Sequence, residues 1–227
     1  MRHEVEVNGH ELVLDREGVL YWPSERILVV ADLHMEKGSA LARRGALLPP
    51  YDTVVTLQKL EAIRKAYEPI TVVSLGDGFH DGRGPKSLSL DVFDQLTRVM
   101  RGVQWCWITG NHDPLIPLEL GGAAIASLDV AGLRFRHEPQ AETGEVAGHL
   151  HPKARVSGRS RKVSRPCFAT DNSHLLMPAF GWYAGGLNVL NKAVNCLFPT
   201  GFDAYLLGDK RLYRLPHGNL MAKAYEL

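Results

Sequence analysis

Carboxylate, imidazole and amide side chains recur at five places along the chain, each where an apolar stretch stops. They are Asp32 and His34, Asp77, Asn111 and His112, His137, and His149 and His151. Such nitrogen and oxygen ligands without thiolate suit Mn²⁺, Fe or Zn²⁺. No cysteine is among these ligand candidates, which argues against a structural zinc site. The spacing of Asp32 and His34 is repeated in His149 and His151. In an extended segment residues two apart point the same way, so Asp32 and His34 can converge on one ion, and His149 and His151 share this two-residue geometry.

This set of ligands is larger than one ion needs. Taken alone, a single short motif of this kind is better explained as an ordinary surface loop. Together they favour two ions that share one carboxylate. Two metal ions about 3.5–4 Å apart acidify a bound water and stabilise the in-line displacement of a phosphoryl group. The pattern therefore predicts metal-dependent phosphate chemistry.

The segments that precede these residues are typical of buried strands. Residues 26–30, 70–75 and 105–108 are compact apolar runs. Amphipathic helices are expected between them, one from an N-cap at Asp52 to Tyr67 and one from Ser87 or Ser89 to Met100. Alternating strands and helices predict a parallel sheet with right-handed crossovers. Ligands of such sheets lie at the carboxyl ends of the strands.

The two ends of the chain differ from this middle part. Residues 4–7 and 10–14 around Asn8-Gly9 predict a hairpin with a type I′ turn, followed by a third strand at 18–22. After Pro117 we expect short strands that extend the sheet in antiparallel fashion. These are residues 124–130, 133–137, 144–147, 166–169, 175–177, 193–197, 204–207 and 212–215. Without a repeat or linker, residues 1–227 are expected to form a single domain.

Composition excludes several classes of protein. Of 227 residues, 45% are hydrophobic and 22% charged, and the net charge is +1, so any affinity for nucleic acid must come from a local patch. No signal-like core and no run of about 18 apolar residues occurs, so secretion and membrane insertion are not expected. The widely spaced Cys106, Cys167 and Cys196 are interpreted as reduced, buried thiols of a cytoplasmic protein.

Asp32-x-His34, Gly76-Asp77, Gly110-Asn111-His112-Asp113, His137 and Gly148-His149-x-His151 resemble the signature of the calcineurin-like metallophosphoesterase superfamily. The resemblance implies a four-layer α/β sandwich, helices outside two mixed central sheets. It implies one metal held by Asp32, His34, Asp77 and His151, and another held by Asp77, Asn111, His137 and His149. It also implies that a metal-bridging hydroxide attacks phosphorus while His112, which is not a ligand, stabilises the phosphorane or protonates the leaving oxygen.

A narrower similarity is to the bacterial ligase-associated DNA-damage-response metallophosphoesterases. It is carried by Leu48-Pro-Pro-Tyr-Asp52-Thr, Gly76-Asp77-Gly-Phe-His80-Asp81, His137-Glu138-Pro139 and Leu176-Met-Pro178-Ala-Phe180-Gly181 with Gly185-Gly186-Leu187. This similarity implies a Mn²⁺-dependent phosphodiesterase, namely a DNA endonuclease that favours single strands. It further implies a role in DNA repair beside an ATP-dependent ligase, a helicase and an exonuclease.

One position departs from the wider superfamily. Three residues after the bridging aspartate, the common pattern has an aspartate that orients the catalytic histidine, whereas this chain has His80 followed by Asp81. Asp81 and Asp113 are the alternative partners for His112. We hypothesise that His80 faces the substrate and donates to a phosphate oxygen, which would favour diesters over monoesters; the alternative is a loop histidine satisfied by backbone.

Two further stretches are candidates for binding substrate. Lys153, Arg155, Arg159, Arg161, Lys162 and Arg165 form a basic run directly after the last ligand. The run is expected either to steer a polyanion into the site or to be a solvated, mobile loop. Arg43 and Arg44 are weaker candidates of the same kind. Phe180, Trp182 and Tyr183 are suited to stacking on a base, although buried packing is the favoured alternative.

The prediction is a phosphodiesterase that loads two divalent ions, with Mn²⁺ preferred and Fe or Zn²⁺ as alternatives, and that hydrolyses DNA. A related enzyme acting on cyclic nucleotides or nucleotide diesters is the first alternative. A non-catalytic scaffold of the same fold is the second, and the intact set of ligands and His112 counts against it.

Overall fold

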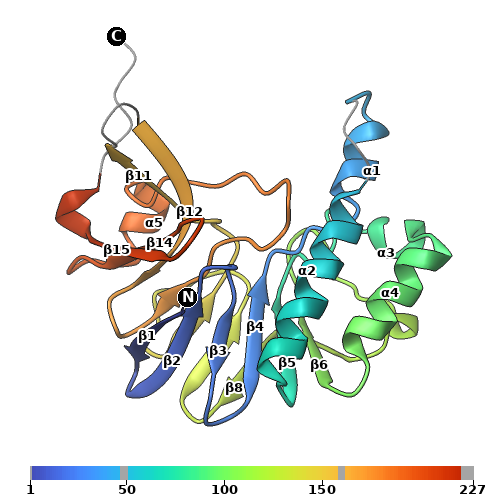
Figure 1. The fold of residues 1–227 in the computed structure, drawn as a ribbon, viewed down its shortest axis with the longest axis horizontal. Helices are drawn as coiled ribbons and strands as arrows, with labels where there is room; N and C mark the ends of the chain where they lie inside the picture. Colours follow the sequence, from blue (N-terminus) through green and yellow to red (C-terminus); the bar gives the residue numbers. More distant parts are fainter. Residues whose placement is uncertain (1, 47–50, 158–161, 221–227) are drawn as a thin grey trace.

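The computed structural model describes residues 2–46, 51–157 and 162–220. Two mixed β-sheets pack face to face, and helices α1 to α4 lie together on the outer side of the first sheet (Figure 1). The first sheet has the strand order β1-β2-β3-β4-β5-β6-β7. Its strands are β1 (Arg2–Val7), β2 (His10–Asp15), β3 (Leu20–Trp22), β4 (Ile27–Ala31), β5 (Thr71–Leu75), β6 (Gln104–Ile108) and β7 (Ala123–Ile125).

The expected hairpin and parallel core of this sheet are confirmed. Strands β1 to β4 pair antiparallel, whereas β4 to β7 pair parallel. Asn8 and Gly9 turn the hairpin with φ angles of 49° and 79°, as a type I′ turn requires. Alternate residues of β4 face opposite ways, so Val29 packs between the sheets and Leu28 packs under the helices.

The crossover helices are α2 (Asp52–Tyr67) and α4 (Leu90–Met100), with the shorter α1 (Lys37–Ala42) and α3 (Gly84–Ser87) added. Ser89 caps α4 by accepting from the amide of Val92 at 3.4 Å. The expected cap at Asp52 is wrong, because Tyr51 occupies the N-cap position. The carboxylate of Asp52 instead accepts from the amide of Gly38 at 3.0 Å and so fastens α1 to the start of α2.

The second sheet has the strand order β15-β14-β12-β13-β10-β9-β8, and β11 pairs with β12. Its strands are β8 (Ser127–Val130), β9 (Leu133–Arg136), β10 (Glu145–Ala147), β11 (Lys153–Ser157), β12 (Lys162–Thr170), β13 (Leu175–Leu176), β14 (Asp203–Leu207) and β15 (Leu212–Pro216). The expectation of purely antiparallel additions is wrong, since β10 runs parallel to both β9 and β13. Residues 124–130 are also not one strand, because β7 belongs to the first sheet and β8 to the second.

Two other local predictions are corrected. Residues 193–197 do not form a strand but lie in and after the helical turn α5 (Lys192–Asn195), capped by Asn191, whose side chain accepts from the amide of Ala193 at 3.0 Å. Val194, Leu197 and Phe198 have helical spacing and pack on the outer face of the second sheet. Cys106 and Cys167 are buried as expected, but Cys196 is exposed.

Three apolar clusters hold these layers together. One lies between the sheets, one lies under α2 and α4, and one lies between the second sheet and the segment around α5. The α/β sandwich with two mixed central sheets is therefore confirmed, with a thin outer layer on the second sheet. Within the described ranges, no helix is both long and apolar enough to cross a membrane.

Candidate binuclear metal centre

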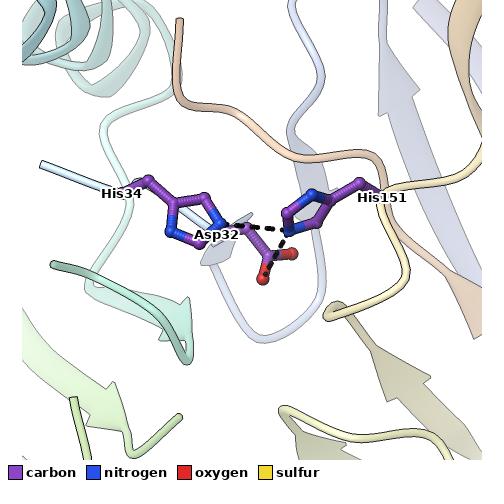
Figure 2. A group of neighbouring side chains, drawn as sticks. All are labelled: Asp32, His34 and His151. Carbon is purple, nitrogen blue, oxygen red and sulfur yellow. Dashed lines mark hydrogen bonds and ion pairs between the residues drawn. The ribbon is translucent and has the colours of Figure 1, made fainter. Parts of the chain in front are cut away.

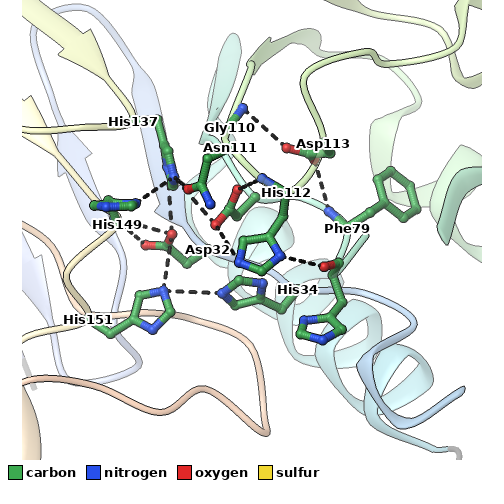
Figure 3. A network of polar contacts seen from close by, with 12 residues as sticks. Asp32, His34, Phe79, Gly110, Asn111, His112, Asp113, His137, His149 and His151 are labelled. Carbon is green, nitrogen blue, oxygen red and sulfur yellow. Dashed lines mark hydrogen bonds and ion pairs between the residues drawn. The ribbon is translucent and has the colours of Figure 1, made fainter. Parts of the chain in front are cut away.

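The ligand candidates come together from both sheets at one edge of the sandwich (Figure 3). Asp32, Asp77 and Asn111 follow β4, β5 and β6 of the first sheet, at the carboxyl ends of parallel neighbours. His137 follows β9, and His149 and His151 follow β10, in the second sheet. Asp32 and Asp77 are 0% and 2% exposed, so their carboxylates lie inside the protein.

A first group consists of Asp32, His34 and His151 (Figure 2). The Nε2 atoms of the two histidines lie 3.2 Å apart, and Nε2 of His151 lies 3.2 Å from Oδ1 of Asp32. A second group consists of Asp77, His137 and His149. Nε2 of His137 is 3.4 Å from Oδ2 of Asp77 and 3.1 Å from Nδ1 of His149. Within each group the ligand atoms lie within 4.8 Å of one another.

These distances fit a pair of bound cations. Ligand atoms about 2.1 Å from a shared ion lie about 3.0–3.4 Å from their nearest neighbours. Oδ1 of Asn111 lies 3.0 Å from Nε2 of His137, which makes it a further ligand for the second group. In the part of the chain that the structure describes, no lysine or arginine forms a salt bridge with Asp32 or Asp77. The side chains paired with these two buried carboxylates are histidines. The carboxylates therefore need added positive charge, which divalent ions supply.

Burial and the two carboxylates shift the pKa values of the histidines in opposite directions. Burial and the nearby charge of His151 lower the pKa of His34 to about 3, so its imidazole is neutral and free to bind a cation. Burial would also lower the pKa of His137, but the carboxylates of Asp77 and Asp32 outweigh burial and raise it to about 9. Burial would raise the pKa of Asp77, but hydrogen bonds and charge from His137 hold it down at about 2. The two carboxylates therefore favour positive charge at this place, which a bound cation would supply.

The orientation of His137 is set by the backbone. Nδ1 of its ring lies 3.0 Å from the carbonyl oxygen of Leu75, and a carbonyl only accepts, so Nδ1 carries the hydrogen. This hydrogen bond points Nε2 at Asp77 and Asn111. Ligating histidines in proteins are commonly held in this way by their other ring nitrogen.

His112 lies at the edge of the same centre. Its amide donates to Oδ1 of Asp77 at 2.9 Å, and its Nε2 lies 4.0 Å from Oδ2 of that residue. Its Nδ1 lies 2.7 Å from the carbonyl oxygen of His80, so Nδ1 donates and Nε2 is left facing the two groups of ligands (Figure 3). Two metal-ligating groups with an imidazole held beside them are the arrangement of a phosphoesterase.

Comparison with known proteins gives the family. The family of calcineurin-like phosphoesterases matches residues 25–209. The chain is a calcineurin-like phosphoesterase. Its structure is similar to the crystal structure of Pseudomonas putida nuclease MPE, with a TM-score of 0.75 and 27% identity, over 95% of this chain and 100% of that chain. The enzyme is accordingly a metal-dependent phosphoesterase, and the alternative of a non-catalytic scaffold is set aside.

Two more solved structures are more distant. Yfce, a phosphoesterase from E. coli, is 14% identical with a TM-score of 0.41, over 84% of this chain and 98% of that chain. The protein AQ665 from Aquifex aeolicus is 15% identical with a TM-score of 0.39, over 55% of this chain and 78% of that chain. A comparison with curated proteins finds no match.

The phosphoesterase does not position its ligands by the regular pleat expected of extended segments. Five ligand candidates have left-handed backbone conformations, with φ between 44° and 69°: Asp32, His34, Asp77, His149 and His151. Leu33, between two of them, is buried in the core under the helices. The chain turns sharply at both residues of each short motif, and such strain is typical of functional sites. Asp32 and His34 converge on one group as expected, whereas His149 and His151 are divided between the two groups, so the shared spacing does not place them on one ion.

The backbone of the loop after β6 lies close to Asp77 at Gly110. The φ angle of Gly110 is not unusual, but a Cβ there would collide with the carboxylate and amide nitrogen of Asp77. The glycine therefore lets the loop after β6 close over Asp77.

Neither expected carboxylate orients His112. Asp81 instead pairs with Arg43 at 3.0 Å and accepts from the amides of Arg83 and Gly84 at 3.0 and 3.1 Å. Asp113 accepts from the amides of Phe79 and Gly110 at 3.0 and 3.2 Å, which ties together the loops after β5 and β6. The orienting group is the backbone carbonyl of His80, which residue types alone could not reveal.

The side chain of His80 stacks on His112, with ring centroids 5.3 Å apart and planes at 24°. Its Nδ1 is buried and has no hydrogen-bond partner among the described residues, so the alternative of a loop histidine satisfied by backbone finds no support. Burial and the charges of Lys37 and His112 lower the pKa of His80, which favours a neutral ring.

Among the residues predicted to bind substrate, Arg43 lines a cavity of about 440 Å³ together with Arg44, Arg83 and Asp81. Arg159 and Arg161 lie outside the described residues. Their basic run is not simply a loop, because β11 and β12 form an antiparallel hairpin from it. Arg165 in this hairpin pairs with Asp209 at 3.2 Å.

Sequence reasoning missed Lys37, at the start of α1. Burial lowers its pKa, while Asp52 and Asp77 act in the opposite direction, and the charge of Lys153 is close enough to lower it further. Two lysines from distant parts of the chain therefore flank the metal centre. Only the position of Lys37, three residues after His34, hinted at this in the sequence.

Proposed function

We propose that this phosphoesterase is a binuclear phosphodiesterase that cuts DNA internally and prefers single strands. The observation that carries the proposal is the pair of Asp/His groups, with His112 held beside both by the carbonyl of His80. Similarity to the nuclease MPE over nearly the whole chain supports a nucleic acid as the substrate.

The metal ions of this proposal are Mn²⁺, with Fe and Zn²⁺ as alternatives. Asp32, His34 and His151 would hold one ion, His137, His149 and Asn111 the other, and Asp77 would contact both. When bound, such ions supply an acidified water and positive charge against a phosphate. Hydrogen bonds and charge from His137 hold the pKa of Asp77 at about 2, so this carboxylate is ionised at neutral pH.

His112 is proposed to give a proton to the leaving oxygen. Its Nδ1 is committed to the carbonyl of His80, so Nε2 is the atom that picks up and releases a proton. With 39% of its side chain exposed, the ring can meet a substrate that enters from solvent. An imidazole exchanges protons readily near neutral pH, which suits this role.

Replacing His112 tests the proposal. His112→Ala is expected to slow hydrolysis of bis-p-nitrophenyl phosphate with Mn²⁺ by about 10²- to 10⁴-fold, the range for loss of a general acid. The metal ligands are retained in this variant, so Mn²⁺ is expected to raise its melting temperature as in the parent. A variant that keeps the parent's rate would remove His112 from the mechanism.

His80 is proposed to contact a phosphate oxygen and to favour diesters over dianionic monoesters. Its ring contacts the rings of His34 and His112, with centroid distances of 5.7 and 5.3 Å. His80→Ala should lower the ratio of bis-p-nitrophenyl phosphate to p-nitrophenyl phosphate turnover. Equal loss or equal retention of the two activities would reject this role.

DNA as the substrate is tested by comparing strands. Single-stranded DNA, duplex DNA, RNA and a cyclic nucleotide should be offered with Mn²⁺ at one salt concentration, since phosphate contacts depend on salt. We expect internal cleavage of single-stranded DNA to be fastest. Preferred turnover of the cyclic nucleotide would replace the nuclease proposal with the alternative of a nucleotide phosphodiesterase.

The cellular role is proposed from the sequence resemblance alone. It is DNA repair in the cytoplasm, in functional association with an ATP-dependent DNA ligase, a helicase and an exonuclease. Deleting the gene in a strain that carries all four should raise its sensitivity to DNA damage. Equal survival of the deleted and parent strains would count against this role.

A further inference from the structure

The segment between β13 and α5, residues 177–191, crosses the metal centre. Near its start the amides of Phe180 and Gly181 donate to the carbonyls of Ala31 and Asp32 at 2.8 and 3.2 Å. Near its end the amide of Leu187 donates to the carbonyl of Leu150 at 3.3 Å. The orange ribbon of this segment passes beside His151 in both close-up views (Figures 2 and 3). Both metal-ligand motifs therefore hold the segment in place.

Two aromatic residues on this segment, Phe180 and Trp182, differ in their exposure. Phe180 is 6% exposed and packs in the core under the helices, with Nζ of Lys59 4.3 Å from the centre of its ring. Gly181 lies so close to the backbone of Leu33 that a Cβ would collide with its carbonyl. The next residue, Trp182, is 69% exposed. Consecutive Cα atoms are about 3.8 Å apart, so Trp182 begins one residue from a direct contact with a metal ligand.

Exposure of this indole is unusual in the molecule. The other three tryptophans, Trp22, Trp105 and Trp107, are 1%, 4% and 1% exposed. A large aromatic ring on rigid backbone offers a face on which a nucleobase can stack, whatever the base. A base in a duplex is already stacked and paired, so such a ring selects an unpaired base.

A lysine from β11 contacts the same segment. Nζ of Lys153 donates to the carbonyl of Ala184 at 3.4 Å, and Lys153 is near enough to Lys37 for their charges to interact. These two lysines supply positive charge near the segment, and electrostatic contact with the phosphate backbone accompanies stacking in single-strand binding.

We propose that Trp182 is the stacking platform for an unpaired base next to the phosphate that is cut. This proposal rests on the proposed function, because only a nucleic-acid substrate supplies a base. It assigns the preference for single strands to a particular side chain.

Tryptophan fluorescence tests the platform directly. Because Trp182 is the exposed one of the four tryptophans, its emission should dominate changes caused by a ligand. The metal-free full chain is titrated with an oligothymidylate and with an abasic strand of equal length, so that no cleavage occurs. We expect saturable quenching by the oligothymidylate and a dissociation constant at least about tenfold weaker for the abasic strand.

The second test compares how tightly variants bind a labelled oligothymidylate, measured by its fluorescence anisotropy. Trp182→Ala should raise the dissociation constant about 5- to 150-fold, the range measured for loss of one stacked base, and Trp182→Phe should restore most of it. Tyr213→Ala is the matched control, because Tyr213 is a 46% exposed aromatic residue on β15, and it should bind like the parent. Melting temperatures check that each variant is folded.

Three results would overturn the proposal that Trp182 stacks on a base. The first is equal quenching by the abasic strand, and the second is unchanged DNA binding by Trp182→Ala. The third is tryptophan emission that depends on protein concentration without DNA, which would mean that Trp182 lies in a contact between copies of the protein. These failures differ from failure of the proposed function. If the parent hydrolyses bis-p-nitrophenyl phosphate but neither binds nor cuts any strand, the nuclease proposal itself is wrong.

Discussion

At the scale of single residues, the centre depends on backbone conformations that its side chains do not prefer. His151 has φ 44° and His34 has φ 45°, where a residue with a Cβ is disfavoured by about 1–2 kcal/mol. The fold tolerates this because the chain must turn at both residues to aim two imidazoles at one point. Metal binding is thus obtained at the expense of local stability.

His151→Asn is predicted to separate these two effects. Asparagine tolerates the left-handed region better than histidine, so the metal-free variant should be as stable as the parent or up to about 1 kcal/mol more stable. Its stabilisation by Mn²⁺ should be reduced, because His151 is proposed to hold one of the two ions. Thermal melts in EDTA and in Mn²⁺ measure both quantities.

Ala131→Gly is the control for that prediction. Ala131 has φ 46° in the turn between β8 and β9, so glycine relieves the same strain away from the ligands. This variant should be stabilised yet keep its response to Mn²⁺. A loss of more than about 1 kcal/mol in metal-free His151→Asn would mean that contacts of the imidazole outweigh the strain.

At the scale of elements, the loops after β5 and β6 are held together by one buried carboxylate. Asp113 is 1% exposed and accepts an amide hydrogen on each oxygen, from Gly110 and from Phe79. Burial raises the pKa of Asp113 to about 6, although these hydrogen bonds act to lower it. The two loops carry Asp77, Asn111 and His112, so Asp113 fixes their relative position.

Asp113→Asn is predicted to destabilise the protein by about 1–3 kcal/mol, because an amide group can accept from only one of the two backbone donors. Denaturant unfolding in EDTA measures the free energy. Asp129→Asn makes the same chemical change at an exposed position of β8 and should destabilise the protein less than Asp113→Asn does. Similar values for both variants would show that Asp113 does not brace the loops.

The helices show a related dependence between elements. α1 follows His34 directly, and it is held by the start of α2 through Gly38 and Asp52 and through the amide of Glu36, which donates to Oγ1 of Thr53 at 2.7 Å. A six-residue helix is too short to be stable alone. Its position, and that of Lys37 within it, therefore comes from a neighbour distant in sequence.

At the scale of the whole molecule, the metal centre joins the two sheets. Asp32, Asp77 and Asn111 come from loops of the first sheet, and His137, His149 and His151 from loops of the second. Ions bound by both sets would act as links across the sandwich and would be lost on unfolding.

Mn²⁺ is therefore predicted to stabilise the fold. One site filled at a hundred times its dissociation constant adds about 2.7 kcal/mol, which is about 5–10 °C in melting temperature for a chain of this size. Differential scanning fluorimetry of metal-stripped and reconstituted protein measures the shift. His149→Ala should reduce the shift and His112→Ala should not; an equal loss in both would contradict the assignment of ligands.

Much of this was available from the sequence. Compact apolar runs ending in Asp32, Asp77 and Asn111 predicted the parallel strands, since burial on both faces requires continuous apolar residues. The spacing of polar residues predicted a site for two ions. The directions of the strands in the second sheet could not be predicted from the sequence. The alternation of apolar and polar residues indicates which face of a strand is buried, but it does not indicate which neighbour the strand pairs with.

The sequence by itself determined the chemistry of the ligands, the layered α/β architecture and the family resemblance that the comparisons confirmed. The tertiary structure alone decided that a backbone carbonyl orients His112 and that Asp81 forms an ion pair with Arg43. It also decided that Trp182 is exposed whereas Phe180 is buried. The reason is physical. Residue types and spacings are local properties, whereas exposure and the partner of a hydrogen bond depend on which distant segments the fold brings together.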